Sequence, residues 1–199
     1  MSKIFHTILA TLFFIILLLT TYWAHVNYFK VNVVFYSALS DGLFATICAA
    51  FTLFLYKSFR IFNKFEKMLL VIIWLFVGYI FAISIPTVID RSLSFYILEK
   101  IHQRGGGIEL SRFEEILTKE FVKEHRLVDV RLTEQQESGT IEIVNGCVKI
   151  TERGKTLVEF SQAFRKNLLP KRRLLMGSYS EDLTNPFRDS DNISSYKCH

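Results

Sequence analysis

The chain has 199 residues, half of them hydrophobic, and a formal net charge of +5. Residues 1–89 hold six Lys/Arg and two acidic residues, whereas residues 90–199 hold 18 Lys/Arg and 17 Asp/Glu. This asymmetry excludes an ordinary soluble globular protein, because such a protein spreads its apolar residues over the whole sequence. The sequence therefore predicts a membrane part before residue 90 and a water-soluble part after it.

Three segments of the first part, residues 4–22, 35–56 and 68–88, are long and apolar enough to be transmembrane helices. A helix needs about 20 apolar residues to cross a hydrocarbon core about 30 Å thick. No small-residue cleavage site follows the first segment, so we expect a retained membrane anchor rather than a cleaved signal peptide. The sequence thus predicts an integral membrane protein with the lipid bilayer as its first partner.

The loop at residues 57–67, between the second and third segments, combines aromatic and cationic residues. Phenylalanine recurs at every third position from Phe59 to Phe65, with lysine and arginine between the rings. This pattern predicts a short helix at the lipid headgroups, with the rings turned towards the lipid and the cations towards water. Arg60 and Lys64 are therefore candidate membrane-surface residues.

Lysine and arginine residues near the segment ends predict membrane orientation, because cytoplasmic loops carry an excess of them. If the loop at residues 57–67 is internal, the N-terminus is inside and the soluble part is outside. The count favours this orientation by only five residues to four, so the side of the soluble part stays open. The five are Lys3, Lys57, Arg60, Lys64 and Lys67, and the four are Lys30, Arg91, Lys100 and Arg104.

One acidic residue, Asp41, falls within the second segment. An ionisable group at membrane depth indicates a functional site, such as a proton relay or a partner for a cationic ligand. The alternative is that Ser40 or Asp41 caps a helix that begins at the membrane surface and leaves Gly42 to Tyr56 as a short tilted span. Asp41 is therefore a candidate intramembrane polar site, with both interpretations open.

From Ser92 onwards the apolar residues follow the period of amphipathic helices. The glycines at 105–107 are not a phosphate-binding loop, because no lysine and hydroxyl residue follow them. We therefore expect them to form a turn that ends the first helix. Ser111 and Glu114 have the spacing of a capping box that begins the second helix. The expected apolar faces are Leu93, Tyr96, Ile97 and Ile101 in the first helix, Phe113, Ile116, Leu117 and Phe121 in the second, and Leu127, Val130 and Leu132 in the third.

A strand pattern replaces the helical one at residues 140–150. Two runs rich in β-branched residues flank Asn145-Gly146, a strong signal for a two-residue hairpin turn. Thr151 then has the position of a helix N-cap, and the helix that follows has an apolar face. The residues of that face are Leu157, Phe160 and Phe164.

This order of helices and hairpin, from about Ser92 to Leu169, resembles the winged helix-turn-helix superfamily. The residues that carry the resemblance are Arg131-Leu132, Ser138-Gly139-Thr140-Ile141-Glu142, Asn145-Gly146, Ile150-Thr151, Arg153-Gly154 and Leu157. They are similar to the end of the recognition helix and the wing of many bacterial regulators. Gln135 departs from the pattern, since this position is usually a core leucine. Together with the three apolar segments, the resemblance implies a mainly α fold class: three transmembrane helices followed by a small α+β winged-helix-like domain.

The resemblance implies either DNA binding or protein docking through the third helix and the wing. Residues 92–169 hold 12 Lys/Arg and 12 Asp/Glu, whereas a DNA-reading domain usually has a basic face. Charge therefore favours protein docking, with nucleic acid as the disfavoured alternative. The candidate partner-binding residues are Lys123, His125, Arg126, Arg131 and Asn145.

Residues 170–199 form a tail that is first basic and then polar. Lys171, Arg172 and Arg173 are candidates for contact with an anionic membrane surface, with an ordinary basic helix end as the alternative. The polar composition beyond Gly177 predicts a flexible segment. The predicted domains are therefore residues 1–90, 91–169 and 170–199.

No catalytic or metal-binding motif is present, and we expect no cofactor. The sequence predicts a non-catalytic membrane adaptor or accessory subunit whose winged-helix-like domain binds another membrane protein, in a process such as envelope assembly. The alternative is a membrane-tethered DNA-binding transcription regulator. An enzyme with its site at the membrane would depend on Asp41 alone. The resemblance to bacterial regulators implies the bacterial inner membrane.

Overall fold

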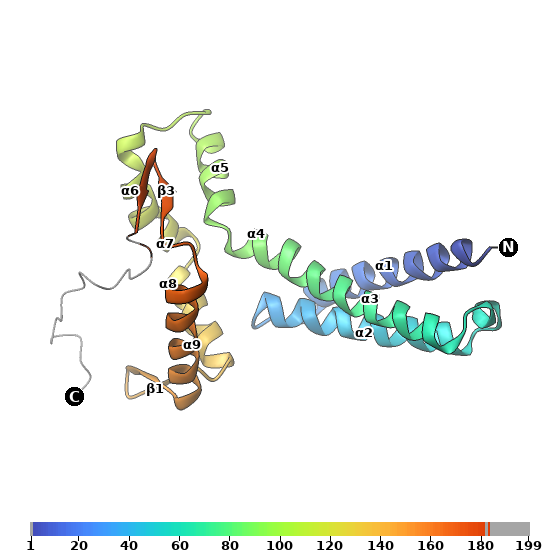
Figure 1. Cartoon of the computed structure of the whole chain (residues 1–199). Coiled ribbons are helices and arrows are strands. Elements are labelled where there is room, and N and C mark those ends of the chain that lie inside the picture. Colours follow the sequence, from blue (N-terminus) through green and yellow to red (C-terminus); the bar gives the residue numbers. More distant parts are fainter. Residues whose placement is uncertain (1, 182, 184–199) are drawn as a thin grey trace. The chain divides into compact units, whose positions relative to one another are not determined.

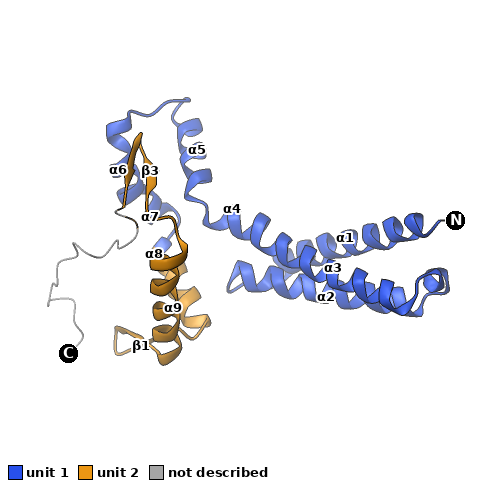
Figure 2. Ribbon diagram, viewed as in Figure 1, with its two compact units in different colours: residues 1–127 blue, residues 128–199 orange. Residues whose placement is uncertain are grey.

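A computed structural model describes residues 2–181 and 183, and its elements are labelled in Figure 1. The chain divides into two compact units, Met1–Leu127 and Val128–His199, which Figure 2 shows in different colours. The chain is mainly helical, with short strands only in the C-terminal part of the described residues. The residues from 184 onwards, which include most of the segment predicted to be flexible, lie outside the described residues.

The first unit begins with three long apolar helices, as the sequence predicts. These are α1 (Lys3–Tyr28), α2 (Val34–Leu55) and α3 (Lys64–Ala82), the last of which continues through η2 (Ile83–Thr87) into α4 (Val88–Arg91). Each of the three segments is long and apolar enough to cross a membrane. The helices lie alongside one another (Figure 1).

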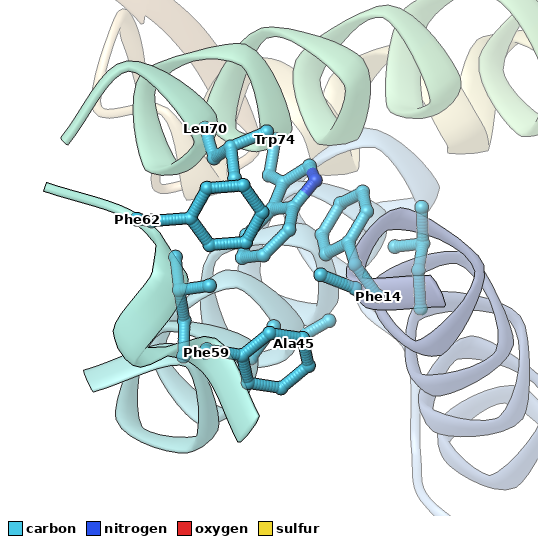
Figure 3. Close-up of a cluster of buried hydrophobic side chains, with 10 residues drawn as sticks. Phe14, Ala45, Phe59, Phe62, Leu70 and Trp74 are labelled. Atoms are coloured by element: carbon cyan, nitrogen blue, oxygen red, sulfur yellow. The ribbon is translucent and has the colours of Figure 1, made fainter. Parts of the chain in front are cut away.

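Aromatic stacking and close backbone contact hold these helices together. Phe14 of α1 stacks on Trp74 of α3, with 5.5 Å between the ring centroids (Figure 3). The Trp74 indole N–H donates to Thr11 Oγ1 over 3.3 Å. Where α2 meets α3, a Cβ built on Gly42 would lie 3.2 Å from Gly78 Cα. Such small-residue contacts are typical of helix packing in membranes, where backbones approach closely.

The loop after α2 forms the short helix that the sequence predicts, η1 (Lys57–Ile61), but its rings are placed differently. Phe59 and Phe62 are buried in the hydrophobic core of the helix bundle, and only Phe65 is exposed (Figure 3). The prediction that all three rings face lipid is therefore wrong for two of them. Their burial closes one end of the bundle, which stabilises the turn from α2 to α3.

A π-helical turn, η2, surrounds Pro86 near the end of the third span. Proline has no backbone N–H, so Pro86 cannot donate to the carbonyl of Ala82 four residues before it. The Thr87 hydroxyl donates to this carbonyl over 2.7 Å. The helix can therefore continue past the proline, as α4 does.

The predicted first soluble helix is α5 (Leu93–Gln103), which Ser92 caps by accepting from the Phe95 N–H. Gly105 and Gly106 follow it with positive φ angles, as expected for the glycine turn. The predicted second helix is interrupted, and its parts are η3 (Leu110–Arg112), α6 (Phe113–Glu115), the π-helical η4 (Ile116–Phe121) and α7 (Val122–Glu124). The predicted capping box is wrong, because the Ser111 hydroxyl donates to the Glu109 carboxylate instead.

The second unit contains helices and two antiparallel hairpins. Its elements are α8 (Leu127–Glu137, which begins at the unit boundary), β1 (Ile141–Val144), β2 (Cys147–Ile150), α9 (Glu152–Leu168), β3 (Arg173–Leu175) and β4 (Ser178–Ser180). Asn145 and Gly146 turn the first hairpin with φ angles of 53° and 75°. Thr151 caps α9 by accepting from the Gly154 N–H. The first hairpin and the cap confirm the sequence predictions, whereas the second hairpin was not predicted.

The junction between α8, the first hairpin and α9 explains the unusual Gln135. The Thr140 hydroxyl donates to both the side-chain and the backbone oxygen of Gln135. The Thr140 carbonyl in turn accepts from the Thr151 N–H, and a Cβ on Gly154 would lie only 2.2 Å from it. A polar residue at position 135 therefore accepts a hydrogen bond in this structure.

Candidate functional site

Asp41 lies in the interior of α2 and does not begin it. The helix starts at Val34, and the preceding Val33 makes no side-chain cap. The Ser40 hydroxyl donates to the Tyr36 carbonyl, as a serine within a helix does. The interpretation of Ser40 or Asp41 as a helix cap is therefore wrong, and the carboxylate lies within the helical span.

His25 is the partner of this carboxylate. Its Nδ1 lies 2.7 Å from Oδ1 of Asp41, and its ring meets Phe29 edge-on. Asp41 is only 5 % exposed, and its second oxygen, Oδ2, has no hydrogen-bond partner. Sequence reasoning missed His25, although one signal was present. A short connection between two spans brings the end of one next to the start of the other, and each residue lies near that connection.

The candidate partner-binding residues do not form one site within either unit. Lys123 lies on α7, His125 and Arg126 lie in the turn after it, Arg131 lies on α8 and Asn145 lies at the hairpin tip. The first three belong to the first unit and the last two belong to the second. Their role in partner binding stays a prediction.

Two of these residues have local contacts. The His125 ring centroid lies 5.2 Å from that of Tyr96 and 4.9 Å from that of Phe121, so it belongs to an aromatic cluster. Arg131 is half-buried and pairs with Glu134 over 2.6 Å. Both contacts are of the kind that stabilises a fold, and His125 is exposed, as are Lys123, Arg126 and Asn145.

A buried lysine joins α5 to η4 and α7. Lys100 Nζ lies 2.7 Å from Glu120 and 2.6 Å from Glu124, and the Tyr96 hydroxyl donates to Glu124. The hydrogen bonds that Lys100 donates to Glu120 and Glu124 raise the pKa of Lys100. The same lysine lowers the pKa of each of the two carboxyl groups. Because every charge in this cluster has a partner, it can stabilise the helices without binding a ligand.

The candidate membrane-surface residues all have exposed side chains. Arg60 lies on η1 and Lys64 begins α3, at the end of the bundle that the buried rings close. Lys171 and Arg172 follow α9, and Arg173 begins β3. Arg172 pairs with Glu181 over 2.9 Å. Exposure agrees with contact to a membrane surface, and the contact itself stays a prediction.

The second unit has an exposed apolar face on α9. Phe160 is 64 % exposed and Leu168 is 69 % exposed, and Leu157 and Phe164 lie on the same side of the helix. We call these four residues the α9 apolar face. Among residues 128–181 and 183, only Thr140 and Gly154 are buried, so this unit buries little apolar surface of its own. Contiguous exposed apolar patches are typical of surfaces that bind another molecule.

Among the described residues, no three His, Cys, Asp or Glu side chains come together in a way that could hold a metal ion. Comparison with protein-family models, with curated proteins and with solved structures found no match to this chain. The winged-helix resemblance therefore has no support from known proteins and stays a prediction.

Proposed function

We propose that this protein is a non-catalytic membrane adaptor or accessory subunit that binds a partner protein through the α9 apolar face. The observation that carries the proposal is the exposure of that face, with Phe160 and Leu168 both more than half exposed. Aromatic and aliphatic side chains on a surface contribute most to binding when a partner removes them from water. The three apolar helices would keep the adaptor in the membrane beside its partner.

Strand edges favour a protein over lipid as the partner. The hairpin β1–β2 has only two strands, so each strand has one edge without a strand partner among the described residues. Its aliphatic side chains Ile143, Val148 and Ile150 are also exposed. A protein can pair with a strand edge, whereas lipid cannot satisfy backbone N–H and C=O groups.

The excess of basic residues in and after α9 indicates that the partner surface carries acidic groups. From Glu152 to Arg173 the chain holds seven Lys/Arg and two acidic residues. A groove that accepts the α9 apolar face and carries carboxylates on its rim would match both the apolar and the basic side chains. The same count over residues 92–169 is balanced, and balanced charge opposes binding to nucleic acid.

We further propose that the soluble part is a winged-helix-like domain that uses its α9 side for docking, in a process such as envelope assembly. The resemblance to bacterial regulators supports the bacterial inner membrane. The lysine and arginine count supports an external soluble part, and hence a partner that is itself a membrane protein with an external surface.

Site-specific photocross-linking in the native membrane tests the adaptor function. The full chain would carry a photoreactive residue at Phe160 or Phe164, and matched controls would carry it at Glu159 or Gln162, which lie on the opposite side of α9. We expect an adduct of one defined mass with a second protein at the first two positions, at least about tenfold stronger than at the controls.

Loss of binding completes this test. The double variant Phe160→Asp, Phe164→Asp should lose co-purification of the cross-linked partner, because it places two charges in an apolar contact. Equal adducts at all four positions would contradict the proposal. Adducts with lipid alone would show that α9 binds the bilayer, and adducts with a second copy of this chain would show self-association instead of an adaptor.

A further inference from the structure

Asp41 is the only buried carboxylate among residues 2–181 and 183. Its Oδ1 has the imidazole of His25 as a partner at 2.7 Å. Its Oδ2 is fully buried and accepts no hydrogen bond. Membrane proteins seldom retain a buried polar atom of this kind unless it has a function.

The unpartnered oxygen indicates which protonation state the site favours. If the carboxylate is charged and the imidazole neutral, the pair has a net negative charge in a dry environment, and such a charge costs several kcal/mol. A proton on Oδ1 removes that charge and turns Oδ2 into a neutral carbonyl oxygen. A neutral oxygen without a partner costs far less than a charged one. The geometry therefore fits a carboxylic acid that is hydrogen-bonded to a neutral imidazole.

His25 is the more exposed member of the pair. The side chain of His25 is 25 % exposed, whereas that of Asp41 is 7 % exposed. An imidazole can take a proton from water at Nε2 and release the one on Nδ1 along the existing hydrogen bond to Oδ1. The pair then gains one proton, and no other group needs to change.

Other ligands fit this site less well than a proton. No third metal-ligating side chain joins Asp41 and His25 within the described part of the chain. A cationic side chain from another protein could not reach Oδ2, because that atom is buried. Tyr22 on α1 interacts electrostatically with Asp41 and with Asp90 on α4. Neither Tyr22 nor Asp90 is a cation.

The third helix adds no compensating charge near the pair. At the level of Gly42, the neighbour of Asp41, α3 presents Gly78. The titratable residues of α3 are Lys64, Glu66 and Lys67 near its start, and Tyr79, which is 47 % exposed. Lys67 is bonded to the carbonyl of Leu53, near the other end of α2.

We propose that Asp41 and His25 form a proton-binding site in the membrane part of this protein, in which Oδ1 of Asp41 carries the proton and His25 exchanges it with water. This inference is independent of the adaptor function. It assigns a ligand to the intramembrane carboxylate, and it gives His25 a role that the sequence alone did not suggest.

Infrared difference spectroscopy of the full chain in lipid nanodiscs tests the site. As the pH is lowered stepwise, we expect a carboxylic acid C=O absorption that exchanges slowly in heavy water, because the acid is buried. The absorption should be lost in Asp41→Asn and retained in Asp90→Asn, which removes an exposed carboxyl group. Absence of a slowly exchanging acid absorption at every pH would overturn the proposal.

A second variant keeps the test decisive if Asp41→Asn does not fold. His25→Gln leaves Asp41 in place but removes the imidazole that bonds to the acid. We expect the acid absorption of His25→Gln to move in frequency and to exchange more slowly with heavy water than that of the natural protein. An absorption that is unchanged in both respects would show that His25 neither bonds to the acid nor exchanges its proton, and would overturn the proposal.

Discussion

Two buried ionisable side chains of the membrane part, Asp41 on α2 and Lys67 on α3, have different partners. Asp41 meets His25, as described above. Lys67 donates to the carbonyl of Leu53 over 2.9 Å, and its ammonium group lies 5.2 Å from the centre of the Phe54 ring. The last carbonyls of a helix have no partner within the helix, so a cation there satisfies one of them and interacts favourably with the helix dipole.

Replacement of Lys67 by methionine should therefore destabilise the helix bundle. The variant keeps most of the apolar stem but leaves the Leu53 carbonyl without its donor. We expect a loss of about 1.5 to 3 kcal/mol, the range for hydrogen bonds to charged groups. Unfolding of the full chain in mixed micelles measures the loss. Lys67→Arg retains a donor and should lose less, whereas equal losses in both variants would show that the hydrogen bond contributes nothing.

Capping residues show the limit of local sequence patterns at this scale. Ser111 and Glu114 have the spacing of a capping box but do not form one, because Ser111 lies within the turn η3. Asn63 and Glu66 form a capping box that was not predicted. The two pairs differ in whether the first residue immediately precedes a helix, and the position at which a helix begins depends on tertiary packing. The pairing of Asp41 was hidden for a similar reason, since its partner lies on another helix.

Close contact between elements is specified by single glycines in both units. Gly42 and Gly78 bring α2 and α3 together, and Gly154 lets the start of α9 approach the Thr140 carbonyl. Membrane spans are predictable because hydropathy is local, whereas these contacts require knowledge of which elements meet. The helix α9 and the hairpin β1–β2 were predicted from turn and cap residues, but their close approach was not.

The variant Gly154→Ala should separate α9 from the hairpin. The added methyl group would lie 2.2 Å from the Thr140 carbonyl oxygen and 2.7 Å from Cγ1 of Ile150. Overpacking costs about 1 to 3 kcal/mol, more than the roughly 0.5 to 1 kcal/mol that alanine gains over glycine in a helix. Hydrogen exchange of the β1–β2 amides in the full chain measures the effect. Gly107→Ala, with no atom within 4 Å of the new methyl group, is the control and should change little.

The contact of α5 with η4 and α7 should weaken in acid. The pKa values of Glu120 and Glu124 are lowered by Lys100, so their stabilisation is complete above the ordinary glutamate value of about 4.3. It is lost as the pH falls through their lowered values in the folded protein. The pKa of Lys100 is raised, so its contribution is lost only above about pH 10.4. Between these limits the contact should not depend on pH.

Hydrogen exchange of α5 measures this dependence, after correction for the intrinsic effect of pH on exchange. We expect faster exchange at pH 3 than at pH 6 in the natural protein. The double variant Glu120→Gln, Glu124→Gln should exchange at similar rates at both pH values. An equal acceleration in acid for both proteins would assign the effect to other carboxyl groups.

At the scale of the whole molecule, the sequence predicts the membrane part better than the soluble part. The apolar spans and the turn residues are local signals, and the structure contains both. The hairpin β3–β4 was not predicted, because Arg173 to Leu175 continue a basic run after α9 and the residues beyond Gly177 have the composition of a polar tail. The apolar face of α9 was predicted, but its exposure was not, because periodicity shows which residues share a face and not what covers that face.

Membrane orientation links the two proposals. Lys3 pairs with Glu66 over 2.7 Å, so α1 and α3 start at the same end of the bundle. That end carries exposed Lys57, Arg60 and Lys64, and an excess of cations predicts a cytoplasmic location for it. His25 lies in the last turn of α1, near the opposite end. With three spans, a cytoplasmic location of that end would put both the proposed proton exchange at His25 and the soluble part outside.

Paired reporter fusions after His199, one active only in the cytoplasm and one active only outside it, measure this orientation. We expect the external reporter to be active, because exposed Lys3, Lys57, Arg60 and Lys64 lie at the end where α1 and α3 begin. The proton-binding site would then respond to the pH outside the cell membrane, and the α9 apolar face would bind an external partner. An active cytoplasmic reporter would contradict the charge rule for this chain. It would move both the source of the proton and the adaptor's partner to the cytoplasm, where the balanced charge of residues 92–169 still opposes binding to DNA.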